Sequence, residues 1–166
     1  MVASPRGACA GSLGQARGFT LIESMVVVAI IAVVATFAGP GMGSIIGSVK
    51  TRSVASDLVM DLTLARSEAI KRNADITVQP VTSGDWSSGW RINSGTVVVK
   101  TRTAAGGITL TGPGLVLTFS PNGRLGGIND DTHARWTVAS VTPGATARCI
   151  VVAASGSARV KPGACS

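Results

Sequence analysis

The chain has 166 residues, a formal net charge of +7 at pH 7 and a mean hydropathy of +0.40. Its charged fraction of 14% lies well below the roughly 25% of soluble domains, which indicates that part of the chain lies in lipid. An aromatic content of 4%, with no Tyr and 21 Gly, favours small residues, β-branched strands and many turns over a large aromatic core. The basic charge suggests attraction to nucleic acid or lipid headgroups, and a merely solvated basic surface is the equally simple alternative.

The first predicted elements are a basic leader over residues 1–18 and an apolar helix. The leader holds Arg6 and Arg17 and no acidic residue. No charged side chain lies between Glu23 and Lys50, and this run exceeds the roughly 20 residues that span a bilayer as a helix. The arginines before the run predict a cytoplasmic N-terminus.

An ordinary signal peptide is the alternative, with Ala35 and Ala38 as cleavage positions. Two features argue against it. The basic leader ends at Gly18, outside the apolar run, and Glu23 lies within an apolar stretch. An ionisable group in lipid costs a few kcal/mol and usually has a partner.

The six residues Gly18-Phe19-Thr20-Leu21-Ile22-Glu23 resemble the prepilin peptidase site of type IV pilins and type II secretion pseudopilins. The resemblance implies cleavage after Gly18, methylation of the new amino group of Phe19, and pairing of Glu23 with the Phe19 amine of a neighbouring subunit. It implies three kinds of partner: prepilin peptidase, other pilins or pseudopilins, and an inner-membrane assembly platform. The expected location is the bacterial inner membrane, crossed once, with the C-terminal domain in the periplasm.

Residues 19–72 are expected to form the N-terminal pilin helix, with residues 19–39 in the membrane and a helix-breaking Gly-Pro stretch at 39–43. Beyond this break, apolar residues recur every three or four positions and predict one buried stripe: Ala55, Leu58, Leu62, Ala65 and Ala69. Charged residues are expected largely off that stripe, among them Asp57 and Asp61. The stripe is expected to pack on a downstream sheet.

Short β-type runs separated by turn signals follow from residue 73 to residue 166. The runs begin at Ile76, Trp90, Thr96, Ile108, Leu115, Trp136 and Cys149. One long helix packed on antiparallel strands predicts an α+β fold with a β-rich periplasmic domain at 73–166.

Three segments resemble the GspH/FimT family of minor pilins and pseudopilins: residues 64–72, residues 86–90 and the run Phe119-Ser120-Pro121-Asn122-Gly123. The resemblance implies a type IV pilin-like fold and a minor pilin that assists pilus assembly, with the FimT-like branch preferred. The alternative is a GspH-like pseudopilin of a type II protein secretion system.

Cys149 and Cys165 remain after removal of the leader, which holds Cys9. Their spacing is not that of a zinc site, and a disulfide in an oxidising compartment is preferred to two free thiols.

No catalytic constellation is evident, and neither enzymatic activity nor a cofactor is expected. His133 is the only histidine. Asp130, Asp131 and His133 could ligate a metal, but an exposed polar loop is the preferred interpretation. Trp86 and Trp90 are expected to flank a Gly turn and to belong to the core.

Double-stranded DNA is the remaining partner considered. FimT-like minor pilins of competent bacteria bind DNA through a Gly-Arg-x-Arg motif near the C-terminus. Here Gly156 and Arg159 match that motif, and Ser157 replaces its first arginine. Lys161 restores a charge on the same strand face as Arg159. Arg148 and Arg124 are possible additions, and a solvated strand end is the alternative.

Overall fold

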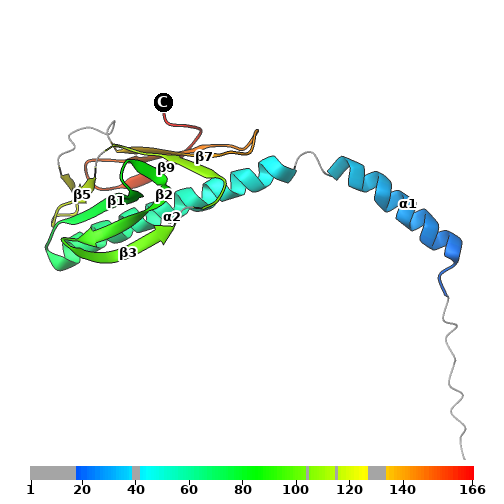
Figure 1. Cartoon of the computed structure of the whole chain (residues 1–166), viewed down its shortest axis with the longest axis horizontal. Helices are drawn as coiled ribbons and strands as arrows, with labels where there is room; N and C mark the ends of the chain where they lie inside the picture. The colour runs from blue at the N-terminus through cyan, green and yellow to red at the C-terminus, as the bar shows by residue number, and fades with distance from the viewer. Residues whose placement is uncertain (1–17, 39–41, 104, 115, 127–133) are drawn as a thin grey trace, which may run out of the picture. The chain divides into compact units, whose positions relative to one another are not determined.

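The computed structural model describes residues 18–38, 42–103, 105–114, 116–126 and 134–166. The chain divides into two compact units, residues 1–39 and residues 40–166. The first contains helix α1 (Leu21–Ala38), and the second contains helix α2 (Met42–Arg72) and two antiparallel sheets (Figure 1). The His133 and Asp130-Asp131 loop falls outside the described residues.

Helix α1 begins after Thr20, whose Oγ1 accepts a hydrogen bond from the backbone N–H of Glu23 at 3.3 Å. This is the bonding of an N-cap residue. Apolar side chains cover the helix, and those of residues 21–36 are exposed in the isolated chain. Among the described residues, no helix combines the length and hydropathy that mark a candidate membrane span.

Helix α2 ends in a left-handed turn at Asn73, where φ is 50°. The Asn73 N–H donates to the Ile70 carbonyl and the Ala74 N–H donates to the Ala69 carbonyl, each at 3.3 Å. These two bonds form a Schellman motif, which satisfies carbonyls that the helix end leaves open.

The apolar stripe predicted on α2 is buried, and Val54 joins it. One expectation is wrong: Asp61 does not lie off the stripe, because its side chain is buried on it with 1% relative exposure. Asp61 follows Leu58 by three residues and precedes Ala65 by four, so helix geometry places it on the stripe's own face.

The five-stranded sheet, called sheet A, has the order β3-β2-β1-β5-β6. Its strands are β1 (Ile76–Thr82), β2 (Asp85–Ser94), β3 (Val97–Thr103), β5 (Leu117–Phe119) and β6 (Leu125–Gly126). The turn expected between the two tryptophans is not present. Gly89 lies inside β2 and pairs with Thr103 of β3, so Trp86 and Trp90 belong to one strand.

The four-stranded sheet, called sheet B, has the order β4-β7-β8-β9. Its strands are β4 (Ile108–Thr111), β7 (Arg135–Ser140), β8 (Arg148–Val152) and β9 (Ala158–Pro162). Strand β9 pairs with β8 and forms one edge of the sheet.

Helix α2 contacts strands of both sheets, and residues of the helix and of both sheets form the hydrophobic core. Trp86 of sheet A and Trp136 of sheet B meet edge to face, with ring centroids 5.3 Å apart. The Trp86 indole N–H donates to the Pro113 carbonyl at 2.8 Å, which satisfies its polar atom. The α+β fold with a long helix packed on antiparallel sheets is therefore confirmed.

Candidate functional site

The N-terminal site consists of Gly18, Phe19 and Glu23, at the start of α1. Phe19 is 79% exposed. Glu23 is an acidic residue in the first turn of α1, and its side chain is exposed among apolar neighbours. Within the described residues its carboxylate has no ion-pair partner. Such a charge on an apolar helix needs a partner from outside the chain if the helix enters lipid.

A second cluster surrounds Asp61, and sequence reasoning missed it. Its carboxylate accepts hydrogen bonds from Lys100 Nζ at 2.7 Å and from Arg102 Nε at 2.7 Å. Trp90 Nε1 donates a third bond at 2.9 Å. Arg102 also lies 3.4 Å from Asp57 and over the Trp90 ring. These contacts tie α2 to β2 and β3.

Burial alone would raise the pKa of Asp61, because desolvation disfavours a charged carboxylate. The hydrogen bonds from Arg102, Lys100 and Trp90 outweigh burial, and they hold the pKa of Asp61 below its usual value. The hydrogen bond to Asp61 raises the pKa of Arg102 in turn. Both oxygens of the ionised Asp61 carboxylate accept hydrogen bonds. The cluster therefore connects α2 to sheet A, and this carboxylate is not free to act as a base.

The predicted disulfide is present. Cys149 of β8 and Cys165 near the C-terminus are bonded, with their Cα atoms 4.9 Å apart. The Cys165 N–H donates to Thr137 Oγ1 of β7 at 3.0 Å. The bridge therefore holds the tail after β9 across the outer face of sheet B.

Strand β9 projects Arg159 and Lys161 together from the outer face of sheet B. Arg159 pairs with Val151 and Lys161 pairs with Cys149, and paired residues of antiparallel strands share a face. Val151 pairs in turn with Arg135 of β7, which places a third cation on this face, about 10 Å away at two strand spacings. We call Arg135, Arg159 and Lys161 the basic face. Arg135 also donates to the Ser166 carbonyl at 2.5 Å.

The described strands of sheet B carry no acidic side chain beside Arg159 and Lys161. Asp85 is the last acidic residue of the sequence apart from Asp130 and Asp131, which lie outside the described residues. Arg159 and Lys161 are both exposed. The arrangement can contact an extended anion through charge, without reading its sequence.

The structure does not bring Arg148 to the basic face. Arg148 shares its face of β8 with buried Ile150 and points toward α2, where it lines two cavities with Arg52. Arg124 is also separate, in the turn between β5 and β6. Two of the four predicted cations therefore lie on one face, and Arg135 is an addition that the sequence did not reveal.

Gly156, the glycine of the motif-like tail, lies in the turn between β8 and β9 with φ of +80°. A Cβ placed there would overlap the Gly123 carbonyl oxygen and would lie 3.2 Å from Arg66 Nε. The Leu125 N–H donates to the Ala154 carbonyl beside this contact at 3.1 Å. Gly156 thus allows the turn before β9 to pack on the turn before β6.

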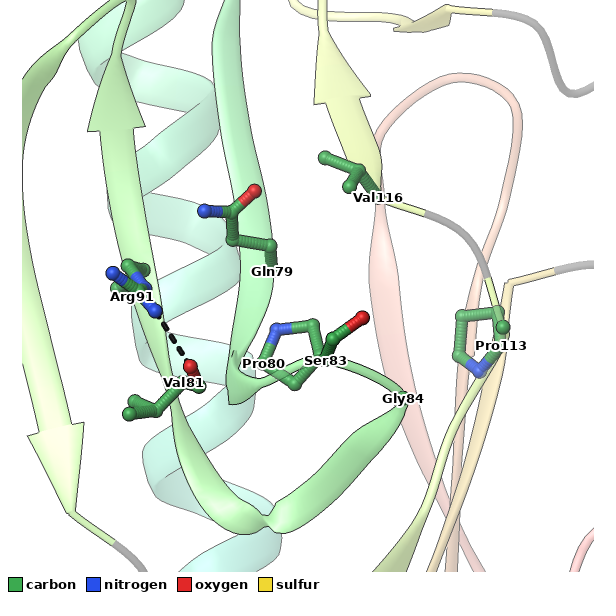
Figure 2. A pocket seen from close by; sticks show the side chains of 9 residues that line it. Gln79, Pro80, Val81, Ser83, Gly84, Arg91, Pro113 and Val116 are labelled. Atoms are coloured by element: carbon green, nitrogen blue, oxygen red, sulfur yellow. Dashed lines mark hydrogen bonds between the residues drawn. The ribbon is translucent and has the colours of Figure 1, made fainter.

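A cavity of about 230 Å³ lies between the β1–β2 hairpin and Pro113, Gly114 and Val116 (Figure 2). Figure 2 shows the Arg91 guanidinium beside Val81, and Arg91 Nη2 donates to the Val81 carbonyl at 2.5 Å. Gln79 faces the same cavity, and no acidic residue lines it. The cavity could hold a small polar group, but it offers neither a nucleophile with a base nor a metal-ligand set.

Metal-binding residues do not cluster in the described part of the chain, where no group of three or more His, Cys, Asp or Glu side chains is found. The Asp130, Asp131 and His133 combination cannot be placed, since it lies outside those residues.

Two family models match the sequence. The family described as type II transport protein GspH matches residues 54–156, and the prokaryotic N-terminal methylation motif matches residues 14–39. A comparison with curated protein sequences finds no match.

Two solved structures are similar in fold, both crystal forms of the type IV minor pilin FimU of Pseudomonas aeruginosa. The first has a TM-score of 0.58 and 24% identity, covering 68% of this chain and 89% of that one. The second has a TM-score of 0.52 and 25% identity, covering 67% and 92%. The likeness supports the fold of a long helix packed on antiparallel sheets.

Proposed function

Because the chain belongs to the GspH family of pilin-like subunits, we propose that it is a membrane-anchored minor pilin that assists assembly of a type IV pilus-like filament. Prepilin peptidase removes residues 1–18 by cutting between Gly18 and Phe19, and the new amino group of Phe19 is methylated. Residues 19–72 form the assembly helix, anchored in the inner membrane through residues 19–39. Residues 73–166 form the periplasmic domain.

The observation that carries this proposal is the exposed Glu23 carboxylate on the apolar surface of α1. Leader removal creates a positive amine on Phe19, four residues before Glu23. In a filament the amine of one subunit meets the Glu23 carboxylate of its neighbour, which offsets the cost of holding either charge in lipid. The inner-membrane platform brings such subunits together, and arginines in the leader keep that end cytoplasmic until cleavage.

Mass spectrometry of protein purified from membranes tests the processing step. A mature N-terminus at methylated Phe19 is expected. An intact leader, or a new N-terminus near Gly39, contradicts the proposal. Glu23→Gln should still be cleaved and methylated but should be depleted from sheared filaments. Glu68→Gln, which removes one carboxylate from α2 instead of α1, serves as the charge-matched control.

A pseudopilin of a type II secretion system is the alternative, and the description of the matching GspH model favours it. The fold likeness to a type IV minor pilin supports the pilus assignment. Deletion of the gene discriminates between the two: loss of surface pili with normal protein secretion supports the minor pilin, and the reverse supports the pseudopilin.

DNA binding is a second candidate activity, supported by the basic face. Arg159 and Lys161 project together from an exposed edge strand, and no described acidic side chain of sheet B offsets them. We propose that this face holds double-stranded DNA through its phosphates, without sequence preference. Gly156 contributes by shaping the turn that leads into β9, and Arg148 and Arg124 lie apart from it.

A further inference from the structure

Two arginines converge on a groove between α2 and sheet B, on the opposite side of that sheet from the basic face. Arg52 of α2 and Arg148 of β8 line two adjoining cavities of about 260 and 370 Å³. The first cavity is completed by Ser44, Ile45, Ser48 and Val49, and the second by Ser56 and Val160. We call this the arginine groove.

No described acidic side chain neutralises the charges of the arginine groove. Among the described residues neither Arg52 nor Arg148 has an ion-pair partner, and no acidic side chain lines either cavity. Arg148 Nε is buried with no hydrogen-bond partner. A buried donor without a partner costs about 1–3 kcal/mol, so a shift of the Arg148 side chain that lets Nε donate to an anion would recover free energy.

The acidic residues of α2 are engaged elsewhere. Asp61 binds Lys100 and Arg102, Asp57 lies 3.4 Å from Arg102, and Glu68 pairs with Arg72. Arg52 and Arg148 therefore remain available for a ligand from outside the chain.

The walls of the arginine groove indicate which anion fits. Guanidinium groups from two sides suit a phosphate, which offers acceptor oxygens in several directions. One end of the groove is apolar, because Ile45 and Val49 are 59% and 63% exposed there. A cationic centre beside an exposed apolar surface is the pattern of membrane-surface binding.

Chain connectivity places this groove near lipid, given the membrane anchor proposed above. Helix α2 begins at Met42, four residues after α1 ends at Ala38, and four residues reach at most about 14 Å. From these observations we propose that the arginine groove binds the phosphate of an anionic phospholipid headgroup in the unassembled subunit, with an acyl chain against Ile45 and Val49.

The test uses the full processed chain in an uncharged detergent, with its N-terminus first verified by mass spectrometry. Dihexanoyl phosphatidylglycerol, titrated by calorimetry, should bind more tightly than zwitterionic dihexanoyl phosphatidylcholine. The double variant Arg52→Gln, Arg148→Gln should weaken binding on the order of thirtyfold, about fivefold for each arginine near an anionic headgroup. Arg159→Gln, Lys161→Gln is the matched control and should bind phosphatidylglycerol like wild type.

Three results would overturn the inference. The first is equal binding of both lipids, and the second is equal binding by wild type and the Arg52, Arg148 variant. The third is binding of inorganic phosphate or of a DNA duplex to the groove as tightly as phosphatidylglycerol. That result would mean that the groove binds phosphate from a source other than lipid. An unchanged thermal midpoint shows that the variants fold. An unprocessed N-terminus would instead refute the proposed function, so the two failures are distinguishable.

Discussion

Gly156 lies so close to the Gly123 carbonyl oxygen that a Cβ at Gly156 would overlap that oxygen. Gly123 itself leaves room for Ile70 and Arg66 of α2, since a Cβ there would lie 2.8 Å from Ile70 Cδ1 and 3.1 Å from Arg66 Nε. Three segments far apart in the sequence therefore meet at one point. The contact joins α2, the β5–β6 turn and the turn before β9.

Gly156→Ala should destabilise the protein by about 3 kcal/mol or more, because the new methyl group meets backbone in addition to an unfavourable positive φ. Gly163→Ala is the matched control: Gly163 has φ of +91° but open space around it. That variant should lose only about 1–2 kcal/mol. Chemical denaturation measures both changes, and equal losses would show that the contact with Gly123 is unimportant.

Asp61→Asn should cost about 3 kcal/mol at neutral pH, because Lys100 and Arg102 lose the charge that they share in a buried site. The pKa of Asp61 is lowered in the folded state, so its contribution is present above its unfolded pKa of about 3.9. It is lost as the pH falls through the lower folded pKa. The stability difference between wild type and variant should therefore shrink below about pH 4.

Urea unfolding between pH 7 and pH 2 measures this dependence. Glu68→Gln is the control, because Glu68 pairs with Arg72, whose side chain is 43% exposed, and takes no part in the buried Asp61 cluster. Its variant should change stability much less at pH 7. A difference for Asp61→Asn that stays constant down to pH 2 would contradict the assigned role of the carboxylate.

The sequence predicted the fold class and the apolar stripe of α2 because both follow from local periodicity. It could not predict the Asp61 cluster, because Lys100 and Arg102 lie about 40 positions from Asp61 in the chain. Only the register of the strands brings their side chains to this carboxylate. Single-residue polarity placed Asp61 on the surface. Its position between Leu58 and Ala65 on the stripe was the signal that could have revealed it.

The candidate sites were predictable to different degrees. Arg159 and Lys161 alternate within one strand, so their shared face could be inferred locally. Arg135 and Arg148 required the register of β7, β8 and β9, which places the first on the basic face and the second on the opposite face. The interpretation of the tail motif alone therefore grouped Arg148 with Arg159 and Lys161, although Arg148 lies on the opposite face of sheet B.

Cys165→Ala should lower the free energy of unfolding by about 3 kcal/mol, because Cys149 and Cys165 close a loop with a sequence separation of 16. Cys149→Ala loses the same constraint, and it also leaves a small hole since Cys149 is buried. The double variant should resemble Cys149→Ala, because the bond is lost only once. Additive losses in guanidinium unfolding would show that the cysteines contribute separately.

Wild-type processed protein in uncharged detergent should bind a DNA duplex with modest affinity and no sequence preference. The logarithm of the binding constant should fall linearly with the logarithm of salt, by about 0.9 units for each phosphate neutralised. Arg159→Gln, Lys161→Gln should reduce that slope by about two units, since both side chains project from β9 onto the basic face. Fluorescence anisotropy at several salt concentrations measures the slope.

The control is the double variant Arg52→Gln, Arg148→Gln. It removes the same charge from the other side of sheet B and should leave the slope nearly unchanged. Equal losses from the two double variants would mean that DNA senses only net charge, and no binding at low salt would leave the subunit with its assembly role alone.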